Sequence, residues 1–165
     1  MTVTTEPETI ITEYQSGHRD DFKRLNVAWI EKYFALEPHD LEQLEHPEMI
    51  LEEGGFIFFA LYENQVVGTC ALVKTHNENT YELVKMAVDG QFQGRQIGKK
   101  LGLAAIGKAR AAGAVQIVLE SNTRLVPAIE LYKKLGFREV EMPADSPYER
   151  ADIRMVLNLE TALLK

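Results

Sequence analysis

The stretch from Glu82 to Leu101, ELVKMAVDGQFQGRQIGKKL, constrains the fold more than any other part of this sequence. Apolar residues occupy both parities between Leu83 and Val88, which is typical of a strand buried on both faces at the centre of a sheet. Gly90 ends that strand, and Gly94 and Gly98 bracket a turn. A helical spacing of apolar residues follows. The stretch therefore predicts a strand, a glycine-rich turn and a helix, in that order.

The start of this helix is a predicted anion site. The first backbone N–H groups of a helix have no partner within it, and the helix dipole places partial positive charge at the same end. Glycines allow a phosphate group to approach the backbone without a Cβ atom in its way. A strand that leads through such a turn into a helix therefore favours phosphate binding. The alternative is a turn that only joins the strand to the helix.

The length and composition predict one globular domain that spans residues 1–165, with its core between about residues 9 and 159. A chain of 165 residues fits one domain. The hydrophobic fraction of 45% and the charged fraction of 26% are those of an ordinary soluble protein.

The charge and the cysteine content exclude several classes of protein. The net charge of −7 argues against a nucleic-acid partner, because no basic surplus exists to replace phosphate counterions. An acidic surface would attract a cationic small molecule, although most acidic domains are simply soluble. Cys70 is the single cysteine, so we expect no internal disulfide and a reducing compartment. The sequence shows neither a signal-peptide pattern nor an apolar run of roughly 20 residues, so we expect a cytoplasmic protein without a membrane partner.

The remaining periodicities predict alternating helices and strands. The expected strands cover residues 9–14, two arms of a hairpin within 56–75, and residues 82–88, 114–119, 137–141 and 151–159. The hairpin turns at Glu63-Asn64-Gln65. The expected helices cover residues 18–34, 38–50, 97–112 and 125–135. The charges in and just after the second helix are interpreted as a solvated face, namely Glu42, Glu45, Glu48, Glu52 and Glu53. The chain shows no linker or internal repeat.

Three pieces of the sequence carry a resemblance to a known family. Residues 86–101 read MAVDGQFQGRQIGKKL, in which Gln93 and Gly98 supply the first and last positions of a pattern of Gln or Arg, two residues, Gly, one residue, and Gly or Ala. Residues 127–137 read PAIELYKKLGF, and Glu82 precedes the first piece. Together they resemble the GNAT superfamily of acyl-CoA-dependent N-acetyltransferases, over nearly the whole chain. The resemblance implies an α/β GNAT fold, with a mixed central sheet of about seven strands flanked by about four helices.

Gln96 departs from the family pattern, because it stands where the middle glycine is usual. Its side chain is expected to point away from the bound pyrophosphate. Other phosphate motifs fit less well. A Walker-type loop needs four residues between its glycines and then Lys followed by Ser or Thr, whereas Gly94 and Gly98 enclose three residues and Lys99 is followed by Lys100. A dinucleotide fingerprint needs a third glycine.

The resemblance implies a site for acetyl-CoA, used as co-substrate without a metal. The pyrophosphate would be held by the backbone around Gln93, Gly94, Arg95, Gln96, Ile97, Gly98 and Lys99. The pantetheine would pair with the backbone of the central strand at Met86, Ala87 and Val88, as an added strand would. The N–H groups of that strand could also polarise the thioester carbonyl, an effect worth about 3–4 kcal/mol.

Glu82 is the candidate general base. An amine of pKa about 10.4 is almost entirely protonated at pH 7, so a base is useful for acyl transfer. Alternation along the strand predicts that Glu82 points to the same face as Val84, Met86 and Val88. The alternative is a glutamate at the end of a strand, in water or paired with Lys85 or Lys74.

Tyr132 is the candidate general acid for the leaving thiolate, because it lies where the family has its tyrosine. A thiolate of pKa about 8.5 leaves fairly well unaided, so the expected gain is small. The alternative is a residue that packs with Ile129 and Leu135. Asn122 follows an apolar strand and is expected to face the cofactor arm, or else to cap the turn into the next helix.

The acceptor site is predicted less specifically. In the superfamily the acceptor usually lies between the first two helices and the loop that joins the last two strands. The polar and aromatic residues available there are Asn26, Trp29, Tyr33, Tyr148 and Arg150. Trp29 and Tyr33 also fit a core role. Arg150 would suit a substrate carboxylate, or would pair with Asp152 or Glu149.

These observations lead to a hypothesis of function. The chain transfers an acetyl group from acetyl-CoA to a primary amine, of a small molecule, by direct attack in a ternary complex. The alternatives are a non-catalytic acyl-CoA sensor or scaffold, and an enzyme that acetylates proteins or peptides. Cys70 lies in a β-rich run with no histidine near it in sequence, so it is not expected to be a nucleophile. Homodimers are common in the superfamily, and nothing in the sequence decides this point.

Overall fold

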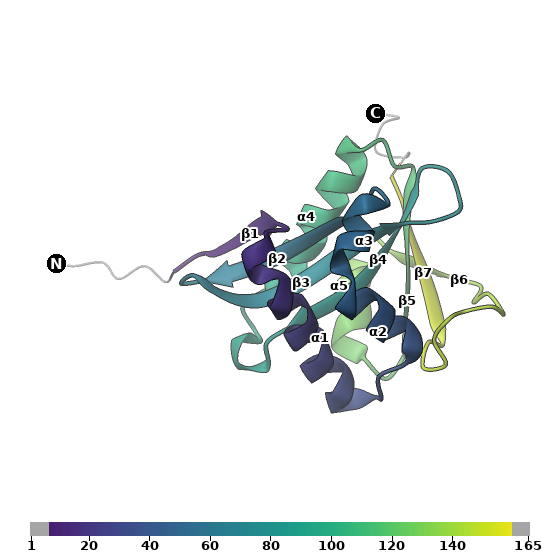
Figure 1. Cartoon of the computed structure of the whole chain (residues 1–165). Helices are drawn as coiled ribbons and strands as arrows, with labels where there is room; N and C mark the ends of the chain where they lie inside the picture. The colour runs from purple at the N-terminus through teal and green to yellow at the C-terminus, as the bar shows by residue number, and fades with distance from the viewer. Residues whose placement is uncertain (1–6, 160–165) are drawn as a thin grey trace.

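The structure, a computed structural model, describes residues 7–159, which form a seven-stranded mixed sheet with helices on both faces (Figure 1). The strand order is β1-β2-β3-β4-β5-β7-β6, and β4 with β5 is the parallel pair at its centre. The strands are β1 (Thr9–Glu13), β2 (Phe56–Tyr62), β3 (Gln65–Lys74), β4 (Thr80–Val88), β5 (Gln116–Ser121), β6 (Arg138–Val140) and β7 (Ile153–Asn158). The sheet and its order confirm the expected mixed α/β fold.

The helices divide between the two faces of the sheet. On one face lie α1 (Arg19–Tyr33), α2 (Pro38–Glu45) and α3 (Pro47–Glu52), whose Phe22, Leu44 and Ile50 share a core with β2, β3 and β4. On the other face lie α4 (Ile97–Ala111) and α5 (Val126–Leu135), which cover a second and larger core. The sheet is therefore buried on both sides at its centre, as its apolar strands require.

The predicted helix over residues 38–50 is wrong in one respect. It is two helices, α2 and α3, which divide at His46, where the backbone leaves the helical region with φ −130° and ψ 57°. Pro47 explains the break, because a proline disfavours helical geometry in the residue before it and cannot donate to the preceding turn. The hairpin of β2 and β3 is as predicted. Glu63 and Asn64 both have positive φ, as a two-residue turn between twisted strands requires.

Helices α4 and α5 approach each other closely through glycines. A Cβ atom on Gly98 would lie 3.1 Å from Leu131 of α5, and one on Gly102 would lie 2.6 Å from Leu135. Both glycines stand on the side of α4 that faces α5. They therefore set the distance between the two helices, which accounts for the helix-interior Gly102 that a propensity argument disfavours.

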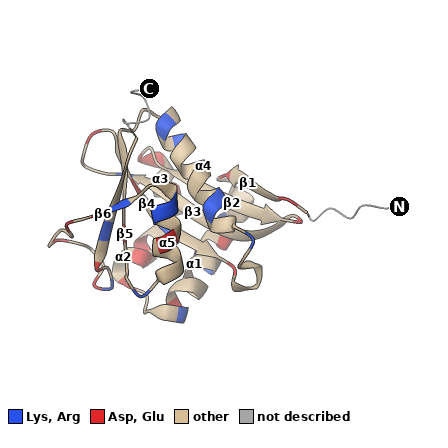
Figure 2. Cartoon of the chain, turned by 180° about the vertical axis from the view of Figure 1, so that it is seen from behind, with Lys and Arg blue, Asp and Glu red and all other residues tan. Residues whose placement is uncertain are grey.

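No helix among residues 7–159 has the length and apolar character that a membrane crossing requires. Seen from the side of α4, acidic and basic positions are interspersed over the surface (Figure 2).

Candidate active site

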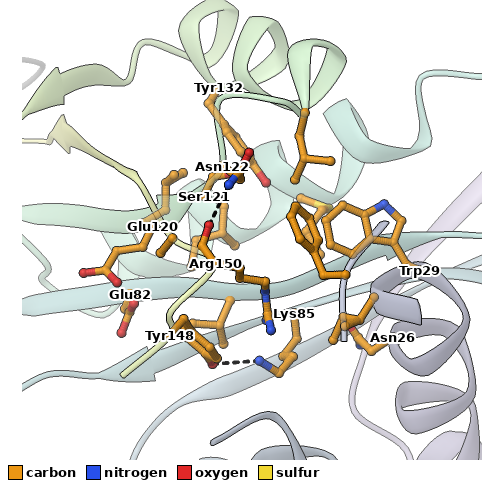
Figure 3. Close-up of a pocket in the computed structure, with 18 residues that line it drawn as sticks. Asn26, Trp29, Glu82, Lys85, Glu120, Ser121, Asn122, Tyr132, Tyr148 and Arg150 are labelled. Atoms are coloured by element: carbon orange, nitrogen blue, oxygen red, sulfur yellow. Dashed lines mark hydrogen bonds between the residues drawn. The ribbon is translucent and has the colours of Figure 1, made fainter. Parts of the chain in front are cut away.

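A cavity opens where the two central parallel strands separate. Strands β4 and β5 pair only at Thr80, Tyr81 and Glu82, and beyond Glu82 they diverge. The edge of β4 that faces β5 therefore has free backbone groups from this point onward. The cavity between them has a volume of about 90 Å³ and is closed by α1, α5 and the loop between β6 and β7 (Figure 3).

A β-bulge in β4 divides the strand between the two faces of the sheet. Lys85 has a left-handed φ of 56°, and two residues of β4, Lys85 and Met86, stand opposite Cys70 of β3. Before the bulge Val84 packs on the side of α1; after it Met86 packs on the side of α4. The simple alternation predicted for this strand is therefore wrong. Glu82 shares a face with Val84 and not with Met86 and Val88, because the extra residue inverts the parity.

Glu82 lies at the point where the strands separate, and its side chain lines the cavity. Its carboxylate makes no hydrogen bond or ion pair with any residue from 7 to 159, so the suggested pairing with Lys85 or Lys74 is absent there. Burial raises the pKa of Glu82, and the neighbouring Glu120 carboxylate adds to this effect. A carboxylate with a raised pKa and no bound partner has the properties of a general base.

Glu120 is a second carboxylate in the same cavity, on the neighbouring strand β5. It accepts hydrogen bonds from Arg154 (3.0 Å) and Ser146 (2.5 Å), so its charge is fixed in place. Figure 3 shows Glu82 and Glu120 at the same end of the cavity. Glu120 therefore acts on Glu82 through its charge, while its own oxygens are occupied.

Tyr132 reaches the cavity from α5 on the opposite side (Figure 3). The residue is 8% exposed, and its hydroxyl makes no hydrogen bond within the described part of the chain. Burial raises the pKa of Tyr132 to about 12, so the hydroxyl keeps its proton at neutral pH. Its ring also packs edge-to-face against Phe137, a contact that the packing alternative did not name. The geometry thus combines a packed ring with an available donor.

Asn122 holds two loops together. Its amide nitrogen donates to the backbone oxygen of Arg150 (2.7 Å), and its amide oxygen accepts from the backbone N–H of Arg124 (2.8 Å). The next residue, Thr123, donates twice to Asp152. These are the contacts of the capping alternative, extended to the loop before β7. The contact of Asn122 with a cofactor stays a prediction.

A buried network of charges forms one side of the cavity, where the acceptor residues were predicted. Lys85 donates to Asp40 of α2 (2.9 Å), and Arg150 donates two hydrogen bonds to the same carboxylate (2.7 Å each). Asp40 is fully buried. Burial alone would raise the pKa of Asp40, but the hydrogen bonds from Arg150 and the charge of Lys85 hold it well below its ordinary value. The suggested pairing of Arg150 with Asp152 or Glu149 is wrong, because its partners are Asp40 and Glu37.

The same network fastens the loop between β6 and β7 onto α2. The hydroxyl of Tyr148 accepts from Lys85 (2.8 Å) and donates to Gln43 (3.3 Å). The carboxylate of Glu37 accepts from the backbone N–H of Glu149 (2.8 Å). The loop is therefore tied to α2 and to β4 by side chains that also form the cavity wall.

The predicted acceptor residues are not all in one place. The cavity brings together Asn26, Trp29, Tyr148 and Arg150. Asn26 is buried, and its amide nitrogen donates to the backbone oxygen of Phe22. Tyr33 lies elsewhere: it is 42% exposed and lines a second pocket, with Trp29 shared between the two.

The predicted pantetheine-binding residues also divide. Met86 lines the cavity, whereas Val88 and Gln93 line the second pocket and Ala87 is buried against the α1 side. Ala87 points to the opposite face from Met86 and Val88, as the alternation of a strand requires. The backbone of all three strand residues lies beyond the point of strand separation, where no β5 residue pairs with it.

The first turn of α4 has backbone N–H groups that precede the hydrogen bonds of the helix. Lys100 donates back to Gln96 (3.1 Å), so the N–H groups of Ile97, Gly98 and Lys99 precede the first bond of the helix. Gly94 has φ 83°, and a Cβ atom there would meet nothing within 4 Å. At Gly98, in contrast, a Cβ atom would lie close to the side chain of Leu131, so this glycine allows the contact with α5. The turn thus fits an anionic group at its surface.

Gln96 shows why a glycine is usual at its position. It caps α4 in the left-handed conformation, with φ 59° and ψ 28°, and its side chain is exposed. Arg95 beside it is held over the ring of Tyr62, with its guanidinium carbon 4.8 Å from the ring centre. The loop keeps the conformation that favours glycine, at the steric cost of a Cβ atom.

The structure also clarifies residues outside this machinery. No group of three or more potential ligands for a metal ion occurs among residues 7–159. Cys70 is fully buried, and burial raises the pKa of its thiol, so a thiolate nucleophile is disfavoured there.

Four residues of the cavity wall or its support escaped the sequence argument, namely Glu37, Asp40, Lys85 and Glu120. The one available signal was Lys85, a charge within an otherwise apolar strand. A buried lysine requires a buried acid, but Asp40 lies 45 positions away in a helix whose acidic residues were assigned to solvent.

Comparisons with known proteins identify the family of this chain. A sequence model of the acetyltransferase (GNAT) family matches residues 20–137. N-acetylaspartate synthetase of Mus musculus is 30% identical over 118 residues, which cover 72% of this chain and 38% of that protein. The chain thus spans less than half the length of that relative. The uncharacterised N-acetyltransferase YjgM of Escherichia coli is 37% identical over 82 residues, covering 48% of this chain and 49% of that protein.

Solved structures share the fold. An acetyltransferase of the GNAT family from Staphylococcus aureus has a TM-score of 0.83 and 24% identity, covering 92% of this chain and 99% of that one. A Salmonella typhimurium acetyltransferase with bound acetyl-CoA has a TM-score of 0.75 and 20% identity, covering 92% and 94% of the two chains. Because the family model covers well over half of the sequence and the fold agrees, this chain belongs to the acetyltransferase (GNAT) family.

Proposed function

We propose that this chain transfers an acetyl group from acetyl-CoA to the primary amine of a small molecule. The observation that carries the proposal is the cavity at the separation of β4 and β5. It combines a partner-free carboxylate, a protonated tyrosine and a free strand edge. The names of two relatives, N-acetylaspartate synthetase and mycothiol acetyltransferase, describe small molecules.

The described residues fit acetyl-CoA. The exposed turn at Gly94 and the start of α4 would hold the pyrophosphate on backbone N–H groups. The free edge of β4 from Met86 to Val88 would pair with the amide groups of the pantetheine arm. Bound acetyl-CoA supplies a thioester, whose carbonyl carbon bonds to the acceptor nitrogen while its C–S bond breaks.

Two side chains move protons in this proposal. Glu82 takes one proton from the acceptor ammonium, which leaves a neutral amine with a lone pair for attack. Tyr132 gives its proton to the departing thiolate, and recovers one from the second N–H that the nitrogen loses on becoming an amide. The net products are therefore one amide, one free CoA thiol and one proton, which Glu82 holds. The raised pKa of Glu82 makes that carboxylate a stronger base than an exposed glutamate.

The test is release of free thiol from acetyl-CoA in the presence of a panel of primary amines and of lysine-containing peptides. We expect thiol release with at least one small amine and none without an acceptor. Binding of CoA without thiol release for any acceptor would instead support a sensor. Release with peptides alone would move the acceptor class to proteins.

A further inference from the structure

We propose that the acceptor carries a carboxylate as well as its amine, so that the cavity recognises a small amino acid through both charged groups. This inference rests on the proposed acetyl transfer and names its acceptor class. Its basis is the arrangement of Glu82, Lys85 and Arg150 around one cavity (Figure 3).

The end of the cavity formed by Glu82 is suited to the amine. The carboxylate of Glu82 is without a partner among residues 7–159, whereas Glu120 beside it is bound to Arg154 and Ser146. An ammonium group placed there would therefore meet one available carboxylate. The hydroxyl of Tyr132 enters from the opposite side, so the reacting nitrogen would lie between base and acid.

The middle of the cavity is suited to an anion. Arg150 uses three of its five N–H donors, two on Asp40 and one on Glu37, which leaves two without a partner in the described chain. Lys85 uses two of its three donors, on Asp40 and Tyr148. The carboxylates that balance these cations do not line the cavity, because Asp40 is fully buried behind them.

These spare donors discriminate between acceptors. An amine without a carboxylate would place hydrocarbon against Arg150 and Lys85 once water has been expelled from the cavity. Unpaired buried donors are costly, so a site built in this way disfavours the analogue that lacks the matching group. An amino acid satisfies the donors with its carboxylate oxygens. The apolar wall of Trp29, Phe34 and Leu125 is available for its side chain.

The rigidity of the network supports recognition rather than chance exposure. Arg150 is held at both guanidinium nitrogens by Asp40, and its backbone oxygen accepts from Asn122. The side chain of Lys85 is only 4% exposed and is held by hydrogen bonds to Asp40 and Tyr148. The spare donors thus have fixed positions before an acceptor arrives, which lowers the entropy cost of binding.

The experiment compares leucine, leucinamide and 3-methylbutylamine, which share the amine and the side chain but differ in the carboxylate. Calorimetric titration, with and without CoA, gives their affinities independently of turnover, and thiol release gives kcat/KM corrected for the neutral amine fraction. Aspartate and glycine extend the series to other side chains. We expect every amino acid that binds to have an affinity and a kcat/KM at least about 10²-fold above those of its analogue without the carboxylate.

Two variants locate the effect. Arg150→Gln should remove most of the preference for the carboxylate, whereas Arg138→Gln, an exposed arginine on β6, should leave it unchanged. Equal binding and turnover of leucine and 3-methylbutylamine by the unmodified chain would overturn the inference and leave acetyl transfer intact. Failure of all amines to release thiol, with amino acids still binding preferentially, would overturn the transfer reaction and leave the carboxylate site standing.

Discussion

The proposed CoA-binding end and the proposed acceptor end of this molecule are built in opposite ways. The first is drawn from one continuous stretch, from Met86 to Lys99, and relies on backbone groups that almost any residue supplies. The second is drawn from α1, α2, β4, β5 and the loop before β7, and relies on particular side chains. Its central ion pair joins Asp40 to Arg150 across 110 positions. A motif can therefore reveal the first end, but only the fold reveals the second.

The largest effect is expected for Glu82→Gln, at the junction of the two ends. Loss of a general base should lower kcat by about 10²–10⁴-fold, while the affinity for acetyl-CoA stays unchanged. In the parent chain kcat/KM should rise with pH as Glu82 ionises, above the ordinary pKa of a glutamate, and the variant should lose that rise.

The pH profile of kcat/KM distinguishes the ionisation of Glu82 from the ionisation of the acceptor amine. Acceptors of different amine pKa should move one limb of the profile and leave the Glu82 limb in place. If Glu82→Gln turns over as fast as the parent chain between pH 6 and 9, Glu82 is not the general base and has only a structural role in the sheet.

Asp40→Asn tests the acceptor end. It leaves Lys85 and Arg150 without their shared counter-charge, so we expect a loss of about 3 kcal/mol in the free energy of unfolding and a raised KM for the acceptor. The pKa of Asp40 is lowered in the folded state, so its contribution is present above its unfolded pKa of about 3.9 and is lost as pH falls below it. Urea unfolding at several pH values measures the loss of stability and its dependence on pH, and the thiol-release assay measures the KM.

Asp20→Asn, at a fully exposed position of α1, is the matched control and should change stability by less than about 0.5 kcal/mol. A variant at Asp40 that unfolds like the control would show that the network contributes little beyond burial.

Tyr132→Phe tests the acid with a smaller expected effect. Because a thiolate of pKa about 8.5 is already a fair leaving group, we expect kcat to fall by about tenfold while acetyl-CoA dissociation stays nearly the same. Tyr81→Phe, another buried tyrosine whose hydroxyl contacts Gly54, should leave kcat unchanged. A large loss of affinity with normal kcat would assign Tyr132 to packing.

Gln96→Gly is the smallest change and should affect only the CoA-binding end. Relief of the left-handed conformation should raise the free energy of unfolding by about 1 kcal/mol, less the entropy that a glycine adds to the unfolded chain. Gln93→Gly, at an extended position with φ −63°, should instead destabilise the protein. A drop in stability for both variants would contradict the proposed strain at Gln96.

The sequence predicted the parts of this molecule that depend on local patterns. The order of most elements along the chain, the hairpin turn at Asn64 and the strand-turn-helix at Gly94 all follow from periodicity and turn chemistry. The bulge at Lys85 did not follow, because one extra residue leaves no mark in an apolar run. Hence the orientation of Glu82 relative to Met86 was mispredicted although both residues were chosen.

The acceptor end was harder for a physical reason. A buried charge pair can be predicted from the sequence only when both partners are known to be buried. Nothing distinguishes Asp40 from the other acidic residues of its helix. Arg150 was identified as a candidate, but its partners could not be assigned from neighbours in sequence. Division of the expected helix at Pro47 was foreseeable from the proline alone.

The glycine contacts between α4 and α5 have a consequence for how this enzyme family member could change. Tyr132 stands between Leu131 and Leu135, the two residues that rest on Gly98 and Gly102. Any larger residue at Gly102 would displace Leu135, and a shift of α5 would carry the tyrosine with it. In the proposed reaction, the position of Tyr132 relative to the thioester would therefore depend on the contact between α4 and α5. A substitution at this contact would change the catalytic rate without changing the groups proposed to bind CoA or the acceptor.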